Sequence, residues 1–319
     1  MKRLVKIVGV LVVALALLIA LGVRRDRPAA AVEARHFAPP SKFVDVDGLR
    51  VHVRDRGQGD AIVLLHGSNS SLFTWEGWAT ELARDHRVVT LDLPGHGLTG
   101  PDPRGRYSAA GMASVVDEVA NRLGLARFTI GGNSMGGDVA WHYALLHPER
   151  VERLILVDAA GYPRDEPKPL AFRLFSLPGV GRVVRYVTPR FMVKKSVREV
   201  YGDPSRVSEA LVDQYEDFTL REGNREATRQ RFALASDGLY ARMSEIRVPT
   251  LILWGSRDRW ILPRYGERFH AEIPGSRLVM LDGLGHVPME EDPARSLAPV
   301  KAFLEQHRAG GGKHAQQAP

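Results

Sequence analysis

The run Gly132-Asn133-Ser134-Met135-Gly136 carries most of the information about the fold of this chain. It directly follows the apolar run RFTIGG (127–132) and directly precedes a helical pattern. A serine at so tight a turn from strand to helix adopts strained backbone angles, so its neighbours must be small. The turn lifts the hydroxyl of Ser134 off a sheet edge and directs the N–H of Met135, at the positive end of a helix, toward the same space. The pattern predicts a nucleophilic serine.

Outside this turn, short apolar runs alternate with amphipathic segments from residue 43 to residue 307. Later runs such as LILV (154–157) and LILW (251–254) are continuously apolar, as in parallel strands covered on both faces. The alternation predicts an α/β fold with a doubly wound, mostly parallel sheet. Strands are expected at Phe43–Val46, Leu49–Arg54, Ala61–Leu65, Arg87–Leu91, Arg127–Ile130, Arg153–Val157, Thr250–Leu253 and Arg277–Leu281.

The alternation stops between Asp158 and Pro249. This insertion predicts a helical cap above the carboxyl ends of the strands, where open α/β sheets bind their ligands. The expected cap helices are Leu170–Leu177, Arg190–Val200, Ser208–Glu222 and Asn224–Leu234. The resulting units are a core in two parts (43–160 and 249–307), the cap (161–248) and a flexible tail (308–319).

The N-terminal residues form a separate unit. Residues 4–23, with no charge from Ile7 to Val23, are apolar enough to predict one transmembrane helix that anchors the protein. Residues 24–42, rich in Ala, Arg and Pro, are expected to form a tether. The apolar run is long for the core of a signal peptide, which favours an uncleaved signal anchor. The cations before and after it nearly cancel under the positive-inside rule, but the short N-terminal tail favours the exported, periplasmic or extracellular side for the rest of the chain. A cleaved signal peptide is the alternative, although cations at Arg24 to Arg27 stand where a neutral cleavage region belongs.

A serine hydroxyl is a poor nucleophile until a base removes its proton. His286, one of eleven histidines, lies in the glycine-rich loop GLGHVP (283–288) after the last expected strand. From there its side chain can reach across the sheet edge. His96, in LPGHG (93–97), is the rival, but that loop is expected to shape the entrance of the site. His286 is therefore the expected general base.

The imidazole in turn needs a carboxylate that fixes its tautomer and stabilises the imidazolium. Asp258 follows the run LILWG (251–255), again at the carboxyl end of a strand. Asp158 ends the preceding strand and is the alternative acid, with turn capping as its other interpretation. The predicted catalytic set is therefore Ser134, Asp258 and His286.

Acyl transfer also needs two N–H donors where negative charge develops, an oxyanion hole. Met135 is expected to supply one donor and Ser68, in the loop HGSN (66–69), the other. No cofactor is expected. No cluster has the spacing of metal ligands, and the lack of cysteine excludes disulfides and thiolate sites. The net charge of +7 is moderate for this length and does not by itself indicate nucleic acid.

These motifs occur in the order HGS, LDLPGHG, GNSMGG, LVDAAG, LILWGSRD and GLGHVPMEEDP. With them the chain resembles the α/β-hydrolase superfamily over about residues 43–307, in which the triad order is Ser, Asp, His. The resemblance implies a cofactor-free serine hydrolase with a helical cap and a small ester-like substrate. GNSMGG also resembles the elbow of meta-cleavage C–C hydrolases and cofactor-free haloperoxidases. The loop HGSNSS in place of HGGGPG, and Val287 in place of an aromatic residue, favour carboxylic ester hydrolysis.

Other functions would use the same fold. One is a catalytically silent receptor or interaction module, which usually lacks a triad member, and another is an acyltransferase that excludes water. The cap also has a stretch from Pro167 to Arg198 without an acidic residue. Such a face either lies in solvent or rests on an anionic membrane surface. Its cations are Lys168, Arg173, Arg182, Arg185, Arg190, Lys194, Lys195 and Arg198.

Overall fold

An eight-stranded sheet forms the centre of the molecule, in the order β1-β2-β4-β3-β5-β6-β7-β8. The computed structural model describes residues 22–163, 177, 179–181 and 185–307. β2 pairs antiparallel with β1 and β4, and all other neighbours are parallel, as the sequence predicts. The strands are β1 (Ser41–Val46), β2 (Leu49–Arg56), β3 (Ala61–Leu65), β4 (Arg87–Leu91), β5 (Phe128–Asn133), β6 (Val151–Val157), β7 (Thr250–Gly255) and β8 (Arg277–Leu281).

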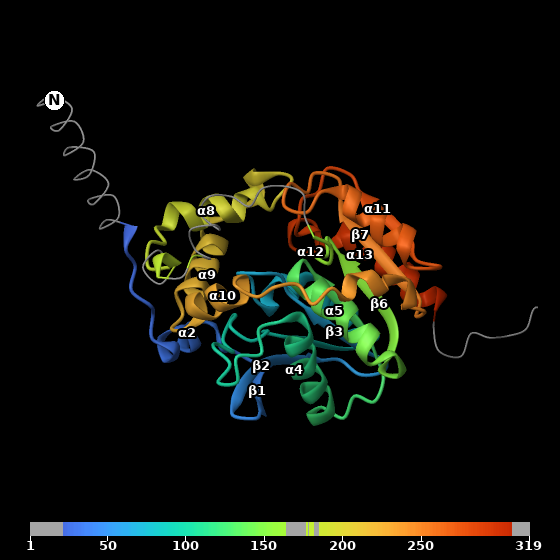
Figure 1. Ribbon diagram of the computed structural model, residues 1–319, viewed down its shortest axis with the longest axis horizontal. Coiled ribbons are helices and arrows are strands. Elements are labelled where there is room, and N and C mark those ends of the chain that lie inside the picture. The colour runs from blue at the N-terminus through green and yellow to red at the C-terminus, as the bar shows by residue number, and fades with distance from the viewer. Residues whose placement is uncertain (1–21, 164–176, 178, 182–184, 308–319) are drawn as a thin grey trace, which may run out of the picture.

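Helices cover both faces of the sheet (Figure 1). One buried core contains Met112 of α4, Val139 of α5 and Phe269 of α11, and a second contains Trp78 of α3 and Leu297 of α13. The crossovers therefore wind in both directions from the centre of the sheet. The helices are α3 (Glu76–Leu82), α4 (Ala109–Arg122), α5 (Met135–Leu146), α11 (Pro263–Glu272), α12 (Pro288–Glu291) and α13 (Pro293–Gln306).

The insertion after β6 contains helices that stand together on one side of the core (Figure 1). Three of them lie where the sequence predicts cap helices: α8 (Arg190–Glu199), α9 (Glu209–Leu220) and α10 (Asn224–Phe232). The helix expected at 170–177 lies outside the described residues except for Leu177. Short 3-10 turns occur at η1 (Leu72–Trp75), η2 (Pro148–Arg150), η3 (Pro204–Arg206) and η4 (Leu239–Glu245).

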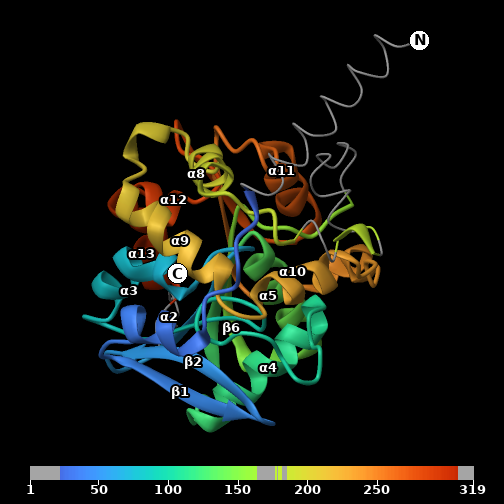
Figure 2. The same ribbon diagram turned by 90° about the vertical axis from the view of Figure 1, so that its left-hand side faces the viewer.

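The segment expected to be a tether is instead folded onto the cap. It contains helix α2 (Ala29–His36), which lies beside α9 in Figure 2. Arg27, Arg35 and His36 all pair with Asp217 of α9. The Ala- and Pro-rich composition of this segment resembles that of a linker. Its cations nevertheless pair with the buried carboxylate of Asp217, which is distant in the sequence. Residues 22–42 therefore belong to the folded unit.

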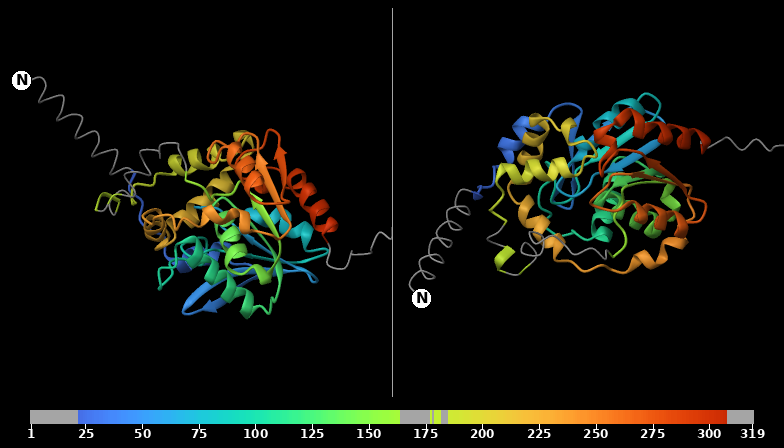
Figure 3. Two further views of the ribbon diagram at one scale, coloured as in Figure 1. Left: turned by 45° about the vertical axis from the view of Figure 1, so that its right-hand side comes forward. Right: turned by 90° about the horizontal axis from the view of Figure 1, so that it is seen from above.

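Figure 3 shows this blue N-terminal segment and the yellow cap helices side by side. Val23 forms an antiparallel bridge with Val187, and the guanidinium of Arg225 binds Asp26 at 2.6 Å. The expected transmembrane helix, residues 4–23, lies outside the described residues apart from Gly22 and Val23. Within the described part of the chain, no helix is both long and apolar enough to cross a bilayer.

The cap cations are less available than their sequence implies. Arg185 pairs with Glu226, Arg190 with Asp213, and Lys194 with Glu209. The acidic partners come from α9 and α10, outside the stretch that lacks acidic residues. Lys168, Arg173 and Arg182 lie outside the described residues. Lys195 also lies 3.7 Å from Glu199 of its own helix, so most cations in the described part of this face have an acidic partner.

Candidate active site

The turn from β5 into α5 has the strained geometry that the sequence predicts. Ser134 has φ 53° and ψ −117°, a conformation that L-residues rarely adopt. Glycine is required on both sides: a Cβ on Gly132 would lie 2.0 Å from the carbonyl oxygen of Gly136. A Cβ on Gly136 would lie 2.1 Å from the carbonyl oxygen of Leu65. The elbow therefore packs directly against the end of β3.

The end of the neighbouring strand β6 and the residues that follow it hold the backbone of the elbow. The N–H of Ser134 donates to the carbonyl of Val157 at 3.1 Å, and the N–H of Ala160 donates to the carbonyl of Ser134 at 2.9 Å. These bonds support a backbone conformation that would otherwise relax. The half-buried side chain of Ser134 is thus presented at the carboxyl edge of the sheet.

The predicted acid and base form a buried pair. Nδ1 of His286 lies 2.7 Å from Oδ2 of Asp258, and both side chains are almost completely enclosed. Because an ionised carboxylate only accepts hydrogen bonds, Nδ1 carries the proton. Nε2 of His286 is then left with its lone pair, as a general base requires.

Asn133 joins the serine elbow to the histidine loop, a role that sequence reasoning missed. Its side-chain amide donates to the carbonyl of His286 at 2.9 Å and to that of Val157 at 3.1 Å. No hydrogen bond links Ser134 Oγ to the His286 ring among the described residues. Catalytic hydrogen bonds of this kind often tighten only when substrate is bound.

The cap holds the histidine loop through a second residue that was not predicted, Glu291. Its carboxylate accepts from the backbone N–H groups of Gly202, Asp203 and Gly285, at 2.8 to 2.9 Å. In addition, the N–H of His286 donates to the carbonyl of Val200 at 2.7 Å. The chain that follows α8 is therefore fastened to the loop that carries His286, the predicted base. An acidic residue shortly after His286 was the only available sequence signal.

The loop after β3 lies against the elbow, as the oxyanion-hole prediction requires. A Cβ on Gly67 would lie 3.1 Å from Cβ of Ser134, so the two backbones are in close contact. Ser68 follows, and its hydroxyl accepts from the Arg231 guanidinium at 2.6 Å. Met135 is the first residue of α5, where the helix leaves the backbone N–H without a partner.

His66 supports this loop rather than taking part in proton transfer. Its Nε2 accepts from the N–H of Leu93 at 3.0 Å, so Nδ1 carries the proton and donates to the carbonyl of Gly67 at 2.7 Å. Burial lowers the pKa of His66, which keeps the ring neutral. The buried carboxylate of Asp92 holds the adjoining loops, accepting from the N–H groups of Leu72 and Leu98.

His96, the rival base, is unsuited to that role. Its Nδ1 bonds the carbonyl of Pro94 at 3.0 Å, within its own loop. Burial, His66 and Arg231 hold its pKa well below the usual range. A ring so difficult to protonate is a weak general base. His286 therefore remains the candidate base, with Asp258 as its carboxylate partner and its loop bonded to Asn133 beside Ser134.

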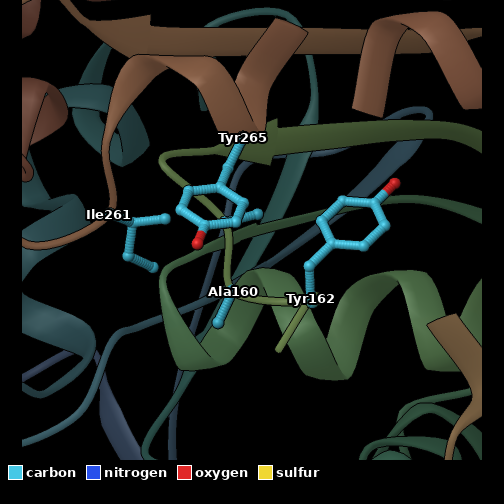
Figure 4. Close-up of a pocket in the computed structure, with 6 residues that line it drawn as sticks. Ala160, Tyr162, Ile261 and Tyr265 are labelled. Carbon is cyan, nitrogen blue, oxygen red and sulfur yellow. The ribbon is translucent and has the colours of Figure 1, made fainter. Parts of the chain in front are cut away.

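Asp158, the alternative acid, lies beside Asp258. Its Oδ1 accepts from the N–H of Gly255 at 2.8 Å. One ligand atom each of Asp158, Asp258 and His286 lie within 4.8 Å of one another, a spacing that a metal ion could also use. The chain continues from Asp158 into a small hollow, shown in Figure 4, whose walls include Ala160, Tyr162, Ile261 and Tyr265.

A sequence model of the alpha/beta hydrolase fold matches residues 60–293, which is most of the chain. The chain belongs to the α/β-hydrolase family. The match includes the elbow, the loop after β3, and the loops that carry Asp158, Asp258 and His286. The resemblance seen in the sequence is thereby confirmed.

Individual relatives of this α/β hydrolase differ in activity. An uncharacterised protein of Mycobacterium tuberculosis is 32% identical over 287 residues, which cover 85% of this chain and 83% of the relative. The 2-hydroxy-6-oxo-2,4-heptadienoate hydrolase of Pseudomonas putida is 31% identical, with 82% and 95% covered. A solved structure described as a membrane phospholipase A and a bacterial virulence factor is 26% identical. It has a TM-score of 0.73 and covers 97% of this chain and 99% of its own.

Proposed function

We propose that this α/β hydrolase cleaves carboxylic esters through an acyl-enzyme on Ser134. The observation that carries the proposal is the strained Ser134 elbow together with the Asp258–His286 pair, joined by Asn133. A hydroxyl at a sheet edge and a base with a free lone pair are the two groups that acyl transfer needs. The substrate class is a small molecule with an ester, or a related lactone, and no cofactor takes part.

In the proposed reaction, Nε2 of His286 takes the proton of Ser134 as Oγ attacks the ester carbonyl carbon. The N–H groups of Met135 and Ser68 stabilise the oxyanion, each worth about 2.7–4 kcal/mol in comparable enzymes. Collapse of the intermediate expels the alcohol, which receives the proton from His286. Water then attacks the acyl-enzyme with His286 as base again, which releases the acid. Asp258 stabilises the imidazolium in both steps.

The test is covalent labelling with a fluorophosphonate probe alongside hydrolysis of p-nitrophenyl esters of increasing acyl length. Wild type should label and hydrolyse, whereas Ser134→Ala and His286→Ala should do neither. Ser114→Ala, which changes an exposed serine of α4, is the matched control and should behave as wild type. Folded wild type that never labels would favour the silent receptor. Labelling with acyl transfer to an alcohol in place of water would favour the acyltransferase.

Carbon–carbon bond hydrolysis is the second candidate, favoured by the identity to the Pseudomonas putida dienoate hydrolase. The two candidates share the catalytic residues and differ in substrate. A vinylogous 2-hydroxy-6-oxo-dienoate and a p-nitrophenyl ester should therefore be compared on one enzyme preparation. A kcat/KM higher for the ester supports the first proposal, and a higher value for the dienoate supports the second.

We also propose that residues 4–23 anchor the enzyme in a membrane. The apolar run and its cationic flank support the proposal, as does the near-complete coverage of this chain by the membrane phospholipase A. Full-length protein should stay with membranes through a high-salt wash, because burial of apolar side chains is not screened by salt. Deletion of residues 1–21 should release the protein, and this boundary keeps the contacts of Gly22 to His36 intact.

The proposed orientation places the catalytic unit on the exported side. An alkaline phosphatase fusion after residue 40 should be active, because that reporter folds only outside the cytoplasm. A cytoplasmic reporter fused at the same place should be inactive. A soluble product beginning near residue 30 would instead identify a cleaved signal peptide.

A further inference from the structure

Three titratable side chains meet at the carboxyl ends of β6 and β7, and the proposed mechanism uses only two of them. Asp158, Asp258 and His286 are 0%, 3% and 6% exposed. The mechanism needs one carboxylate for the imidazole, yet the positions after both strands hold an aspartate. Asp158 also has a φ of 44°, a left-handed conformation that Asp, Asn and Gly tolerate best. The fold therefore keeps a second carboxyl group where its charge would be costly.

The hydrogen-bond donors around the two carboxyl groups are unequal. Asp258 accepts from the N–H groups of Trp260 at 2.7 Å and Ile261 at 3.0 Å, and from Nδ1 of His286 at 2.7 Å. Asp158 accepts one N–H, that of Gly255, on Oδ1. Its Oδ2 is buried and has no donor among the described residues. Hydrogen bonds to the charged form stabilise it, so the ionised member of the pair is Asp258.

The remaining proton belongs to Asp158, because two adjacent buried carboxylates cannot both be ionised. Burial and the charge of Asp258 raise the pKa of Asp158 well above its usual range, and the carboxylate of Glu291 acts in the same direction. As a hydroxyl, Oδ2 of Asp158 becomes a donor. An oxygen of Asp258 lies within 4.8 Å of an oxygen of Asp158, so the carboxylate of Asp258 is the nearby acceptor for that donor.

We propose that Asp158 is a positioning residue that, as a carboxylic acid, donates a hydrogen bond to the carboxylate of Asp258 and thereby sets the strength of the His286 base. The proposal rests on the proposed ester hydrolase function only through that base. Asp158 neither replaces Asp258 nor merely caps a turn. Asp158 supplies the carboxylate of Asp258 with a hydrogen-bond donor from a direction in which no backbone N–H is available.

The proposal has a definite consequence for proton affinity at His286. The donor on Asp158 withdraws negative charge from Asp258, so the imidazolium of His286 is stabilised less than a fully charged carboxylate would stabilise it. Without the donor, His286 keeps its proton to higher pH, so the acidic limb of the pH–rate profile shifts to higher pH. Among the described residues, the ionisable groups that act on Asp158 include Asp258, His286 and Glu291, and all three remain in the variants below.

The first experiment observes the proton directly, by infrared spectroscopy of protein labelled with carbon-13 in the aspartate carboxyl group. At mildly alkaline pH, wild type should show the carbonyl band of a protonated aspartic acid, and Asp158→Asn should lack it. The Ser134→Ala protein should keep the band, so this result does not depend on whether Ser134 is the nucleophile. A wild type without the band, or a band that persists in Asp158→Asn, would overturn the proposal.

The second experiment measures kcat/KM for a p-nitrophenyl ester as a function of pH. Asp158→Gly removes the donor and suits the left-handed backbone, and its acidic limb should move up by ~0.5–1 pH unit. Asp158→Asn keeps a donor, its side-chain N–H, and should return the limb to the wild-type position. If Asp158 has only a structural role, the acidic limb should lie at the same pH in wild type, Asp158→Gly and Asp158→Asn. That outcome would disprove the proposal even if Asp158→Gly lost stability.

A bridging cation is the alternative occupant of this cluster, because its ligand atoms are suitably close. Metal analysis of the purified enzyme distinguishes the two. Less than stoichiometric metal and a rate unaffected by chelator support a bridging proton. One equivalent of metal that is lost in Asp158→Asn would overturn the assignment.

Discussion

Asn133 directly precedes Ser134, and its side-chain amide donates a hydrogen bond to the backbone carbonyl of His286, at 2.9 Å. The same amide also binds the carbonyl of Val157, at the end of β6. One neutral side chain therefore fixes three loops that come from different strands. The relative position of the proposed nucleophile and the proposed base therefore depends on the neutral side chain of Asn133.

Replacement of Asn133 by alanine should lower both stability and rate. The change removes the donor of the His286 carbonyl and leaves the Val157 carbonyl with the N–H of Ser134 alone, which should lower the free energy of unfolding by about 1–3 kcal/mol. Loosening of the histidine loop should lower kcat by about 10²-fold, the cost typical of a small misplacement of reacting groups. Urea unfolding and ester hydrolysis measure the two effects. Asn121→Ala, on the exposed side of α4, should change neither, and an equal effect there would contradict this role for Asn133.

Replacement of Asp258 by asparagine should lower kcat by ~10³–10⁴ while KM changes little. The asparagine amide favours the imidazole tautomer with the lone pair on Nδ1, and the base then faces away from Ser134. Steady-state kinetics on a p-nitrophenyl ester make the measurement. Asp282→Asn, an exposed aspartate just after β8, is the control. A loss no larger than in that control would show that another group orients the imidazole.

Glu290 predicts a pH dependence of stability. Its carboxyl group lies 2.7 Å from the hydroxyl of Tyr201 and 3.0 Å from that of Tyr215. Burial outweighs these bonds and raises the pKa of Glu290. Above the unfolded pKa, the folded protein keeps a proton that the unfolded chain releases, so stability falls as pH rises toward the folded pKa and is then constant.

Glu290→Gln removes this titration, so its stability relative to wild type should increase from acidic to neutral pH. Urea unfolding of both proteins across that range gives the difference. Glu305→Gln, an exposed glutamate on α13, should run parallel to wild type. A Glu290→Gln curve that also runs parallel would contradict the direction assigned to the pKa of Glu290.

Asp217→Asn should release the N-terminal segment from the cap. Although burial raises the pKa of Asp217, its partners His36, Arg27 and Arg35 together hold that pKa below the usual value. Loss of the carboxylate should lower the free energy of unfolding by about 1–3 kcal/mol, since Arg27 and Arg35 are partly solvated. Trypsin should then cut the variant faster at Arg24 to Arg35. Asp213→Asn, exposed on the same helix, should be cut at the wild-type rate.

Local patterns were sufficient to predict the sheet and the elbow. The central strands β3, β6 and β7 contain continuous apolar runs, and the requirement for small residues around Ser134 is expressed within five adjacent positions. The parallel order follows from the alternation with helices. Strand ends were less certain: β5 begins at Phe128 and extends through Asn133, because the sheet continues pairing with β6 up to the turn.

Roles that depend on distant partners had no local signature. Asn133 and Glu291 act by bonding the backbone of remote segments, and a polar residue in a loop has the same appearance whether it does this or not. Asp158 was recognised as an acid near the site. Its protonation became evident only when the donors around it and around Asp258 could be compared.

The contact between Arg27 and Asp217 joins positions 190 residues apart in the chain. During synthesis, Arg27 cannot form this contact until the 190 residues up to Asp217 have been added to the chain. Ordering so long a loop is slow and entropically unfavourable, so the contact is expected to form late in folding. Until it forms, the cap lacks one of its supports. Completion of the cap thus depends on a late contact between the segment that contains Arg27 and helix α9.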